Sequence, residues 1–152
     1  MVRLRDAGPA DEAFVAGLVP RFVEHGAAGT HTPEEVIAGT ARVLSEALHA
    51  PREGDVFWIA EDAGGAPVGF VYAVTERDFF TREPYLHVSE IVAARSGAGI
   101  GARLMEAVER RAHERGYRFV TLNVFDGNPA GRRFYERLGY GPGHHHYVKR
   151  LG

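Results

Sequence analysis

Three alternating glycines, Gly97, Gly99 and Gly101, follow a β-branched run around Ile91 and precede a stretch with helical periodicity. Because glycine has no Cβ, the backbone of such a loop can approach a ligand closely and adopt left-handed conformations. The helix that follows would direct unpaired N–H groups and the positive end of its dipole at the loop. These residues therefore predict a phosphate-sized anion site between a strand and a helix.

The glycine loop admits three interpretations. A P-loop would require a lysine after its last glycine, and none lies near this segment. A dinucleotide-binding pattern, Gly-x-Gly-x-x-Gly/Ala, is met by Gly97, Gly99 and Ala102, but such a domain begins with its glycine loop, and residue 97 of 152 leaves too little chain for the remaining βα units. A glycine-rich turn without a ligand is the third interpretation, and a second motif weakens it.

The second motif is a short helix with clear boundaries. Asn128 is a good N-cap, Pro129 suits the first helical position, and Gly139 can end the helix in a left-handed conformation. Helical spacing places Tyr135 on the same face as Asn128, where it could contact a ligand. A tyrosine at the edge of the core remains the alternative.

Together, the two motifs resemble those of the GNAT superfamily of N-acetyltransferases. The family's acetyl-CoA loop reads Gln/Arg-x-x-Gly-x-Gly/Ala, and its next helix commonly reads Asn-x-x-Ala-x-x-x-Tyr before Gly-Phe/Tyr. The matching residues are Gly99, Gly101, Asn128, Gly131, Tyr135, Gly139 and Tyr140. One position departs from the pattern, because Ser96 stands where the family has Gln or Arg, and Arg95 comes one residue earlier.

The resemblance implies a mixed α/β (α+β) fold, with a mostly antiparallel sheet, one bulged strand and helices on both faces, built as a single domain over 1–152. Hydrophobic alternation predicts strands, and helical periodicity with caps predicts helices. The expected strands are 2–5, 55–61, 67–75, 85–92, 118–125 and 143–151. The expected helices begin near Pro9, Pro33, Ile100 and Pro129, with Pro20 kinking or ending the first and Val36, Val43, Leu44 and Leu48 of the second facing inward.

The resemblance also implies roles for individual residues in direct acetyl transfer to an amine. Tyr135 would protonate the leaving thiolate, and Glu90 would act as general base, with His87 as the alternative base. The coenzyme-binding residues would be Ile91, Val92, Ala93, Ser96, Gly97, Ala98, Gly99, Ile100, Gly101, Ala102, Asn128, Gly131, Phe134 and Tyr135. The acceptor pocket would use Glu24, His25, Phe79, Phe80, Tyr85 and His87.

Composition and charge limit the class of protein. The 152 residues contain no cysteine, which excludes a disulfide framework and a cysteinyl acyl-enzyme. No apolar run suggests a signal peptide or a membrane span, so we expect a cytoplasmic protein without a membrane partner. His144–His146 suggest metal binding only weakly, and we expect no metal.

Charge is divided along the chain. Residues 1–94 carry 7 Lys/Arg against 15 Asp/Glu, a net charge of −8, whereas residues 95–152 carry 11 against 5, a net charge of +6. A basic part suits a polyanionic coenzyme, and an acidic part suits an amine of a small molecule or peptide. Nucleic acid is not an expected partner, and homodimerisation stays open. An acyl-CoA-binding sensor without turnover is the alternative to an acetyltransferase.

Overall fold

The structure is a computed structural model and describes residues 1–24 and 29–152. Its strands are β1 (Arg3–Asp6), β2 (Val56–Glu61), β3 (Pro67–Arg77), β4 (Pro84–Ala93) and β5 (Val120–Leu122). Its α-helices are α1 (Glu12–Leu18), α2 (Pro33–His49), α3 (Ile100–Glu114) and α4 (Pro129–Arg137). Two 3₁₀ helices, η1 (Pro9–Asp11) and η2 (Val19–Val23), flank α1.

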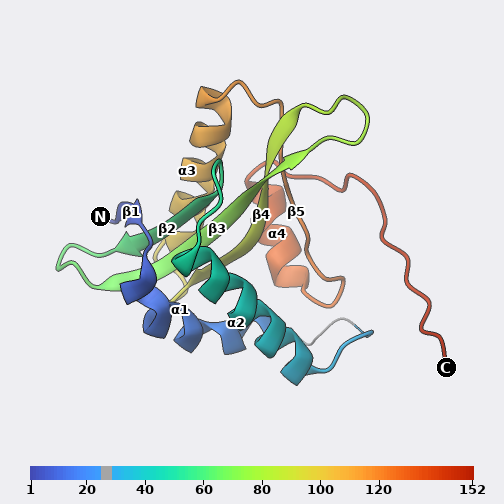
Figure 1. Cartoon of the computed structure of the whole chain (residues 1–152), viewed down its shortest axis with the longest axis horizontal. Coiled ribbons are helices and arrows are strands. Elements are labelled where there is room, and N and C mark those ends of the chain that lie inside the picture. Colours follow the sequence, from blue (N-terminus) through green and yellow to red (C-terminus); the bar gives the residue numbers. More distant parts are fainter. Residues whose placement is uncertain (25–28) are drawn as a thin grey trace.

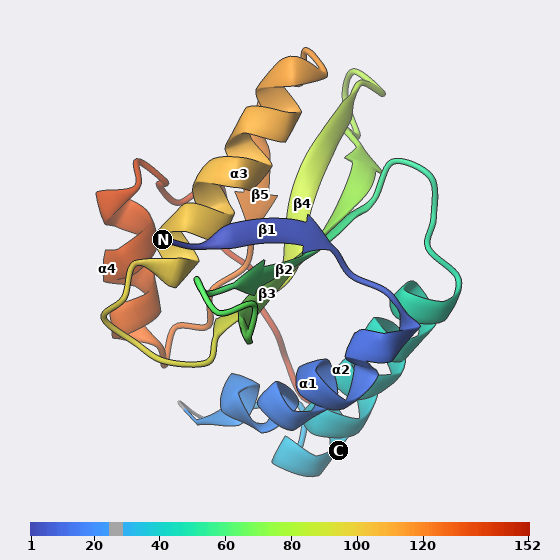
Figure 2. The ribbon, with the colours of Figure 1, turned by 90° about the vertical axis from the view of Figure 1, so that its left-hand side faces the viewer.

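The five strands form one sheet in the order β1-β2-β3-β4-β5, in which β5 runs parallel to β4 and the other neighbours are antiparallel. Helices α3 and α4 lie on one side of the sheet and α1 and α2 on the other (Figures 1 and 2). The expectation of a mostly antiparallel sheet covered on both faces is confirmed.

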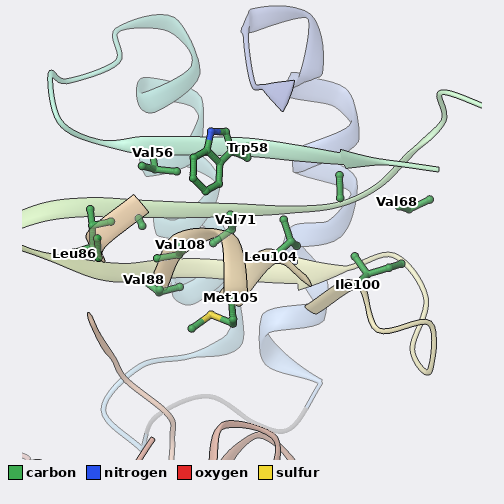
Figure 3. Close-up of a cluster of buried hydrophobic side chains, with 13 residues drawn as sticks. Val56, Trp58, Val68, Val71, Leu86, Val88, Ile100, Leu104, Met105 and Val108 are labelled. Atoms are coloured by element: carbon green, nitrogen blue, oxygen red, sulfur yellow. The ribbon is translucent and has the colours of Figure 1, made fainter. Parts of the chain in front are cut away.

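Each face of the sheet has its own hydrophobic core. On one side, Leu104, Met105 and Val108 of α3 are fully buried against the inward residues of the strands (Figure 3). On the other side, Leu44 of α2 packs with Phe70 of β3. Burial of apolar area on both faces holds β3 and β4 rigidly in the middle.

Helix boundaries follow local chemistry. The Thr32 side chain accepts a hydrogen bond from the Glu35 N–H and the Glu35 carboxylate accepts one from the Thr32 N–H, which completes a capping box at the start of α2. The first helix ends at Leu18 and continues as η2, which contains Pro20. The predicted interruption at this proline is confirmed.

The expected bulge lies in β4. Tyr72 of β3 pairs with Glu90, whereas the next residue, Ala73, pairs with Val88. Ser89 is therefore the extra residue on β4. The bulge places Glu90 and Val92 on the same face of the sheet as His87, because their partners Tyr72, Phe70 and Val74 alternate along β3.

Three predictions about the elements are wrong. The segment 143–151 forms no strand; it is exposed along its length and runs away from the sheet (Figure 1). Its alternation of residue types satisfies a strand pattern but finds no partner strand in the described chain. Strand β5 covers only 120–122 of the predicted 118–125, and Val43 is 38% exposed rather than buried, because it lies beside the inward face of α2.

Candidate functional site

The glycine loop presents free backbone donors at the start of α3. Gly97 and Gly99 have φ values of 79° and 71°, the left-handed region that glycine adopts without strain. The N-cap of α3, Gly99, offers no side-chain cap, and the first N–H bonded within the helix belongs to Arg103. The N–H groups of residues 100–102 are therefore left for an anion.

At Gly101, the absence of a side chain matters for packing rather than for a left-handed backbone conformation. A Cβ built on it would lie 3.2 Å from the Phe134 ring of α4. Its lack of a side chain lets α4 close against the first turn of α3. The two sequence motifs therefore meet in space, as the predicted site requires.

One edge of β4 is open next to this loop. Strand β5 pairs with β4 only at residues 86–88, so residues 89–93 have no strand beside them on that edge within the described chain. The Ala94 N–H donates to the Val68 carbonyl of β3 at 2.7 Å. Because backbone groups alternate in direction along an antiparallel ladder, Ile91 and Ala93 direct theirs toward the open edge.

Glu90 lies at the bulge that opens this edge. Burial raises the pKa of its carboxyl to about 7, and no described residue forms a hydrogen bond or ion pair with its side chain. An acid with a pKa near 7 exchanges protons readily at neutral pH. The bulge and the surrounding sheet thus create a candidate general base.

Tyr135 approaches from α4, on the other face of the sheet. Its ring lies in an aromatic group, with centroids 5.0 Å from Phe134 and 6.0 Å from Tyr140. Burial, and then the negative charge of Glu90, raise the pKa of Tyr135 to about 12. The electrostatic effect of Glu90 on Tyr135 means that these two side chains lie near each other.

Asn128 acts as a helix cap in this structure. Its Oδ1 accepts a hydrogen bond from the Gly131 N–H at 3.0 Å. A Cβ built on Gly131 would lie 2.6 Å from Asn128 Nδ2, so the small residue leaves room for the cap. The side-chain oxygen of Asn128 is engaged in holding α4, and its amide N–H₂ group remains available.

The predicted acceptor residues are not all brought together. His87 lies on the Glu90 face, where its Nδ1 is 2.7 Å from Thr121 Oγ1 and burial lowers the pKa of its imidazole. Tyr85 packs on Phe119 with ring centroids 4.9 Å apart. His87 pairs with Thr121 in the middle of the β4–β5 ladder, and Tyr85 comes one residue before that ladder, so neither lies in the open stretch 89–93 of β4. Glu24 is an exposed turn residue.

Phe79 and Phe80 lie away from the site. Both are 88% exposed in the loop between β3 and β4, and this hairpin tip and the glycine loop lie at opposite ends of β4 (Figure 2). A strand rises about 3.3 Å per residue, so Pro84 at the start of β4 is roughly 20 Å from Glu90. His25 lies outside the described residues.

Arg95, beside the glycine loop, lies near a carboxylate in another turn. Another arginine takes a position that the motifs do not predict. Arg95 Nη2 is 3.6 Å from Asp62 Oδ2, in the turn between β2 and β3. Arg21 of η2 instead donates a hydrogen bond to the carbonyl of Ala93, at the open edge of β4. The sequence offers one signal for Arg21, because it is the only Lys or Arg between Arg5 and Arg42.

A separate groove of about 970 Å³ lies between α3, β1 and the β2–β3 turn. Arg103 and Arg110 at its rim both pair with Glu106, and Arg111 lies over the Trp58 ring, 4.9 Å from its centroid, and within 3.8 Å of Glu114. These carboxylates neutralise the cations of the groove, and neither Glu90 nor Tyr135 lines it.

Two further classes of site find no support in the described residues. No three His, Cys, Asp or Glu side chains in 1–24 and 29–152 lie close enough to hold a metal ion, and His144–His146 are exposed. No helix in the same ranges has the length and apolar character needed to cross a bilayer.

Comparison with known proteins places this geometry in a family. A family model for the acetyltransferase (GNAT) family matches residues 24–140. The uncharacterized N-acetyltransferase YdgE of Bacillus subtilis (strain 168) is 22% identical over 132 residues, which cover 85% of this chain and 84% of YdgE.

Two solved structures have the same fold. The GCN5-related N-acetyltransferase of Ralstonia eutropha JMP134 superposes with a TM-score of 0.78 at 20% identity, over 100% of both chains. The ribosomal-protein-alanine N-acetyltransferase of Brucella melitensis biovar Abortus 2308 superposes with a TM-score of 0.72 at 20% identity, over 99% of both chains. With its glycine loop, bulged strand and open β4 edge, the chain belongs to the GNAT family of acetyl-CoA-dependent acyltransferases.

Proposed function

We propose that this protein transfers the acetyl group of acetyl-CoA directly to a primary amine of a small molecule or peptide, with 1–152 acting as one domain. The observation that carries the proposal is that Glu90, at the bulge of β4, and Tyr135 of α4 lie near enough to each other for the charge of Glu90 to raise the pKa of Tyr135. A base and a hydroxyl donor on the two sides of one edge suit attack by an amine and departure of a thiolate.

The backbone fits acetyl-CoA without large side-chain contacts. The free N–H groups at the start of α3 would hold the pyrophosphate, and the outward backbone groups of Ile91, with the N–H of Ala93, would hold the pantetheine arm as an added strand would. When bound, acetyl-CoA supplies the thioester from which the acetyl group is transferred. The remaining predicted coenzyme contacts are Val92, Ser96, Gly97, Ala98, Gly99, Ile100, Gly101, Ala102, Asn128, Gly131 and Phe134.

Glu90 would accept a proton from the attacking amine. With a pKa of about 7 it is substantially ionised at neutral pH, and it is still basic enough to take up the proton as the new C–N bond forms. Its ionised form also attracts a cationic acceptor. His87 is a weaker candidate, because its Nδ1 is engaged with Thr121 and burial lowers its pKa.

Tyr135 would act as the donor to the leaving sulfur. A thiol has an ordinary pKa of about 8.5, so a tyrosine with a pKa of about 12 stabilises a thiolate mainly by hydrogen bonding rather than by complete proton transfer. Protonation of Glu90 removes the negative charge that helps to raise the pKa of Tyr135. Proton uptake by the base therefore makes the donor more acidic at the moment the thiolate departs.

The acceptor would enter from the side of α1 and α2. Glu90, His87 and Tyr85 share that face, and residues 1–94 carry a net charge of −8, which favours an amine over an anionic acceptor. Glu24, His25, Phe79 and Phe80 remain proposed acceptor residues for larger substrates. One structural relative is named for acetylation of a ribosomal-protein alanine, so peptide amines belong in the test.

The experiment is an acetyl-CoA assay of thiol release with amino acids, polyamines, aminoglycosides and peptides that have a free N-terminus. Amine-dependent release of CoA, with formation of the N-acetyl product by mass spectrometry, is the expected result. Thermal stabilisation by acetyl-CoA without release on any amine would favour a binding module instead. Absence of both stabilisation and release would refute the proposed site.

A further inference from the structure

The glycine loop and the first turn of α3 offer no unpaired side-chain cation to the diphosphate that the proposed function places there. Ser96 stands at the Gln/Arg position of the loop, and Arg95 is 3.6 Å from Asp62. Arg103, in the first turn of α3, lies 3.8 Å from Glu106. Backbone N–H groups carry no full positive charge, whereas an arginine would add charge-assisted hydrogen bonds to the phosphate oxygens.

Arg21 is placed to supply the missing charge. It comes from η2, on the α1 and α2 side of the sheet, and its Nη1 donates to the Ala93 carbonyl, which faces the open edge of β4. Guanidinium has five N–H donors, and this contact uses one. No described carboxylate forms an ion pair with Arg21, whereas other arginines of the N-terminal half, Arg3 and Arg5, are paired with Glu61.

The end of β4 and the start of α3 are direct neighbours. A Cβ built on Gly69 of β3 would lie 2.9 Å from Ile100 Cγ2 and 3.3 Å from the Ala93 Cα. The carbonyl that holds Arg21 is thus next to the helix turn whose N–H groups are free. Arg21 is also half-buried, and a partly buried cation is less screened by salt than an exposed one.

We propose that Arg21 is a positioning residue for the coenzyme, and that its guanidinium pairs with the pyrophosphate of CoA at the junction of β4 and α3. The inference rests on the proposed function. Its contact with Ala93 holds the planar guanidinium at the edge before the coenzyme arrives, and its remaining donors bind the phosphate oxygens. The cation missing from the loop motif is thereby supplied from η2, far from the loop in sequence.

The test compares CoA with pantetheine, which lacks the diphosphate, by titration calorimetry on Arg21→Gln. We expect the Kd for CoA to rise about 10-fold and the Kd for pantetheine to stay within about 2-fold. The dependence of CoA affinity on salt concentration should also become weaker, because one phosphate contact is lost. Arg95→Gln removes the same charge next to the loop and is the matched control, with both affinities expected unchanged.

Each outcome decides the inference. An unchanged Kd for CoA in folded Arg21→Gln, or an equal loss of CoA and pantetheine, would overturn it, and the second result would make the Ala93 contact a structural clamp. If Arg21→Gln does not fold, Arg21→Lys is measured instead. A rise of about 3-fold in the Kd for CoA alone would support the inference, and equal losses of affinity for CoA and pantetheine would overturn it. Failure of the wild-type protein to bind CoA would instead refute the proposed function.

Discussion

Glu90 shows how one inserted residue can create a reactive group. Without the bulge, Ser89 would take its place in regular alternation, and the carboxylate of Glu90 would share the face of Val88 and point toward α3 and its hydrophobic core. With the bulge it shares the face of His87, buried enough to raise its pKa to about 7 yet without a described hydrogen-bond partner. The motif in the sequence names this residue, but its pKa depends on burial that only the packed sheet supplies.

Replacing Glu90 by Gln should separate activity from stability. The folded protein holds a proton on Glu90 between pH 4.5 and about 7, where the unfolded chain has lost it. Stability from this group therefore falls as pH rises through that window. We expect Glu90→Gln to raise the free energy of unfolding by roughly 1–3 kcal/mol at pH 8 and to change it little at pH 4.

The same variant should lose the pH dependence of the reaction. Because the base must be ionised, kcat/KM of the wild type should rise with pH through about 7. Glu90→Gln should lower it roughly 10²- to 10⁴-fold and remove that inflection. Glu46→Gln, an exposed change on α2, is the control. An inflection that survives in Glu90→Gln at a pH below 6.5 would assign the base to His87.

Tyr135→Phe should separate binding from turnover. The ring keeps its contacts with Phe134 and Tyr140 while the hydroxyl donor is deleted, so the Kd for acetyl-CoA and the melting temperature should stay near wild type. We expect kcat to fall roughly 10- to 10⁴-fold. Tyr147→Phe in the exposed C-terminal segment is the control. Wild-type kcat in Tyr135→Phe would mean that water or another residue serves the thiolate.

At the scale of elements, the glycine loop and the start of α3 together form the proposed anion site. Left-handed Gly97 and Gly99 turn the chain so that three helix N–H groups face the site, while Gly101 admits the Phe134 ring. Gly97 and Gly99 therefore matter for the backbone conformation, and Gly101 matters for the contact with Phe134. Substitutions should distinguish backbone strain from loss of the ligand site.

Gly99→Glu should abolish stabilisation by CoA. A side chain at φ 71° is strained by about 1 kcal/mol, and its negative charge would occupy the anion site. Gly116→Glu is a closely matched control, because Gly116 has φ 74°, also has open space around it and lies beyond the far end of α3. Both variants should lose similar stability in thermal unfolding, but only Gly99→Glu should lose the CoA-dependent shift. An equal shift in both would place the anion elsewhere.

Sequence reasoning worked best where a structure is specified locally. The capping box of Thr32 and Glu35 and the cap of Asn128 gave correct helix starts, because their hydrogen bonds span only three residues. Pairing is not local, so alternation could neither limit β5 to three residues nor reveal that 143–151 has no partner. Arg21 was missed for the same reason, since Ala93 is 72 residues away.

At the scale of the whole molecule, the acidic and basic halves of the sequence contribute different parts of the proposed site. The acidic half contributes η2, α2 and the face that would receive the amine, and the basic half contributes the glycine loop, α3 and α4. Arg21 is the proposed exception, a cation of the acidic half serving the coenzyme. Transfer would thus occur along β4, the strand at which the two halves meet.

The C-terminal segment gives a prediction for the whole chain. Residues 141–152 are exposed, and no hydrogen bond or ion pair found in the described chain joins them to the rest. Deleting 143–152 should therefore shift the melting temperature by less than about 2 °C, since roughly 1 kcal/mol corresponds to 2–4 °C in a protein of this size. Affinity for CoA should stay within about 2-fold.

The same deletion tests whether the C-terminal tail, residues 143–152, binds a second copy of the chain in solution. Tyr147, Val148 and Leu151 are 89%, 56% and 83% exposed, and β5 offers an unpaired edge among the described strands. Light scattering on the full and shortened chains provides the second measurement, with equal masses expected. A fall of more than about 5 °C, together with a halved mass, would contradict the prediction and show that the tail holds two copies of the chain together.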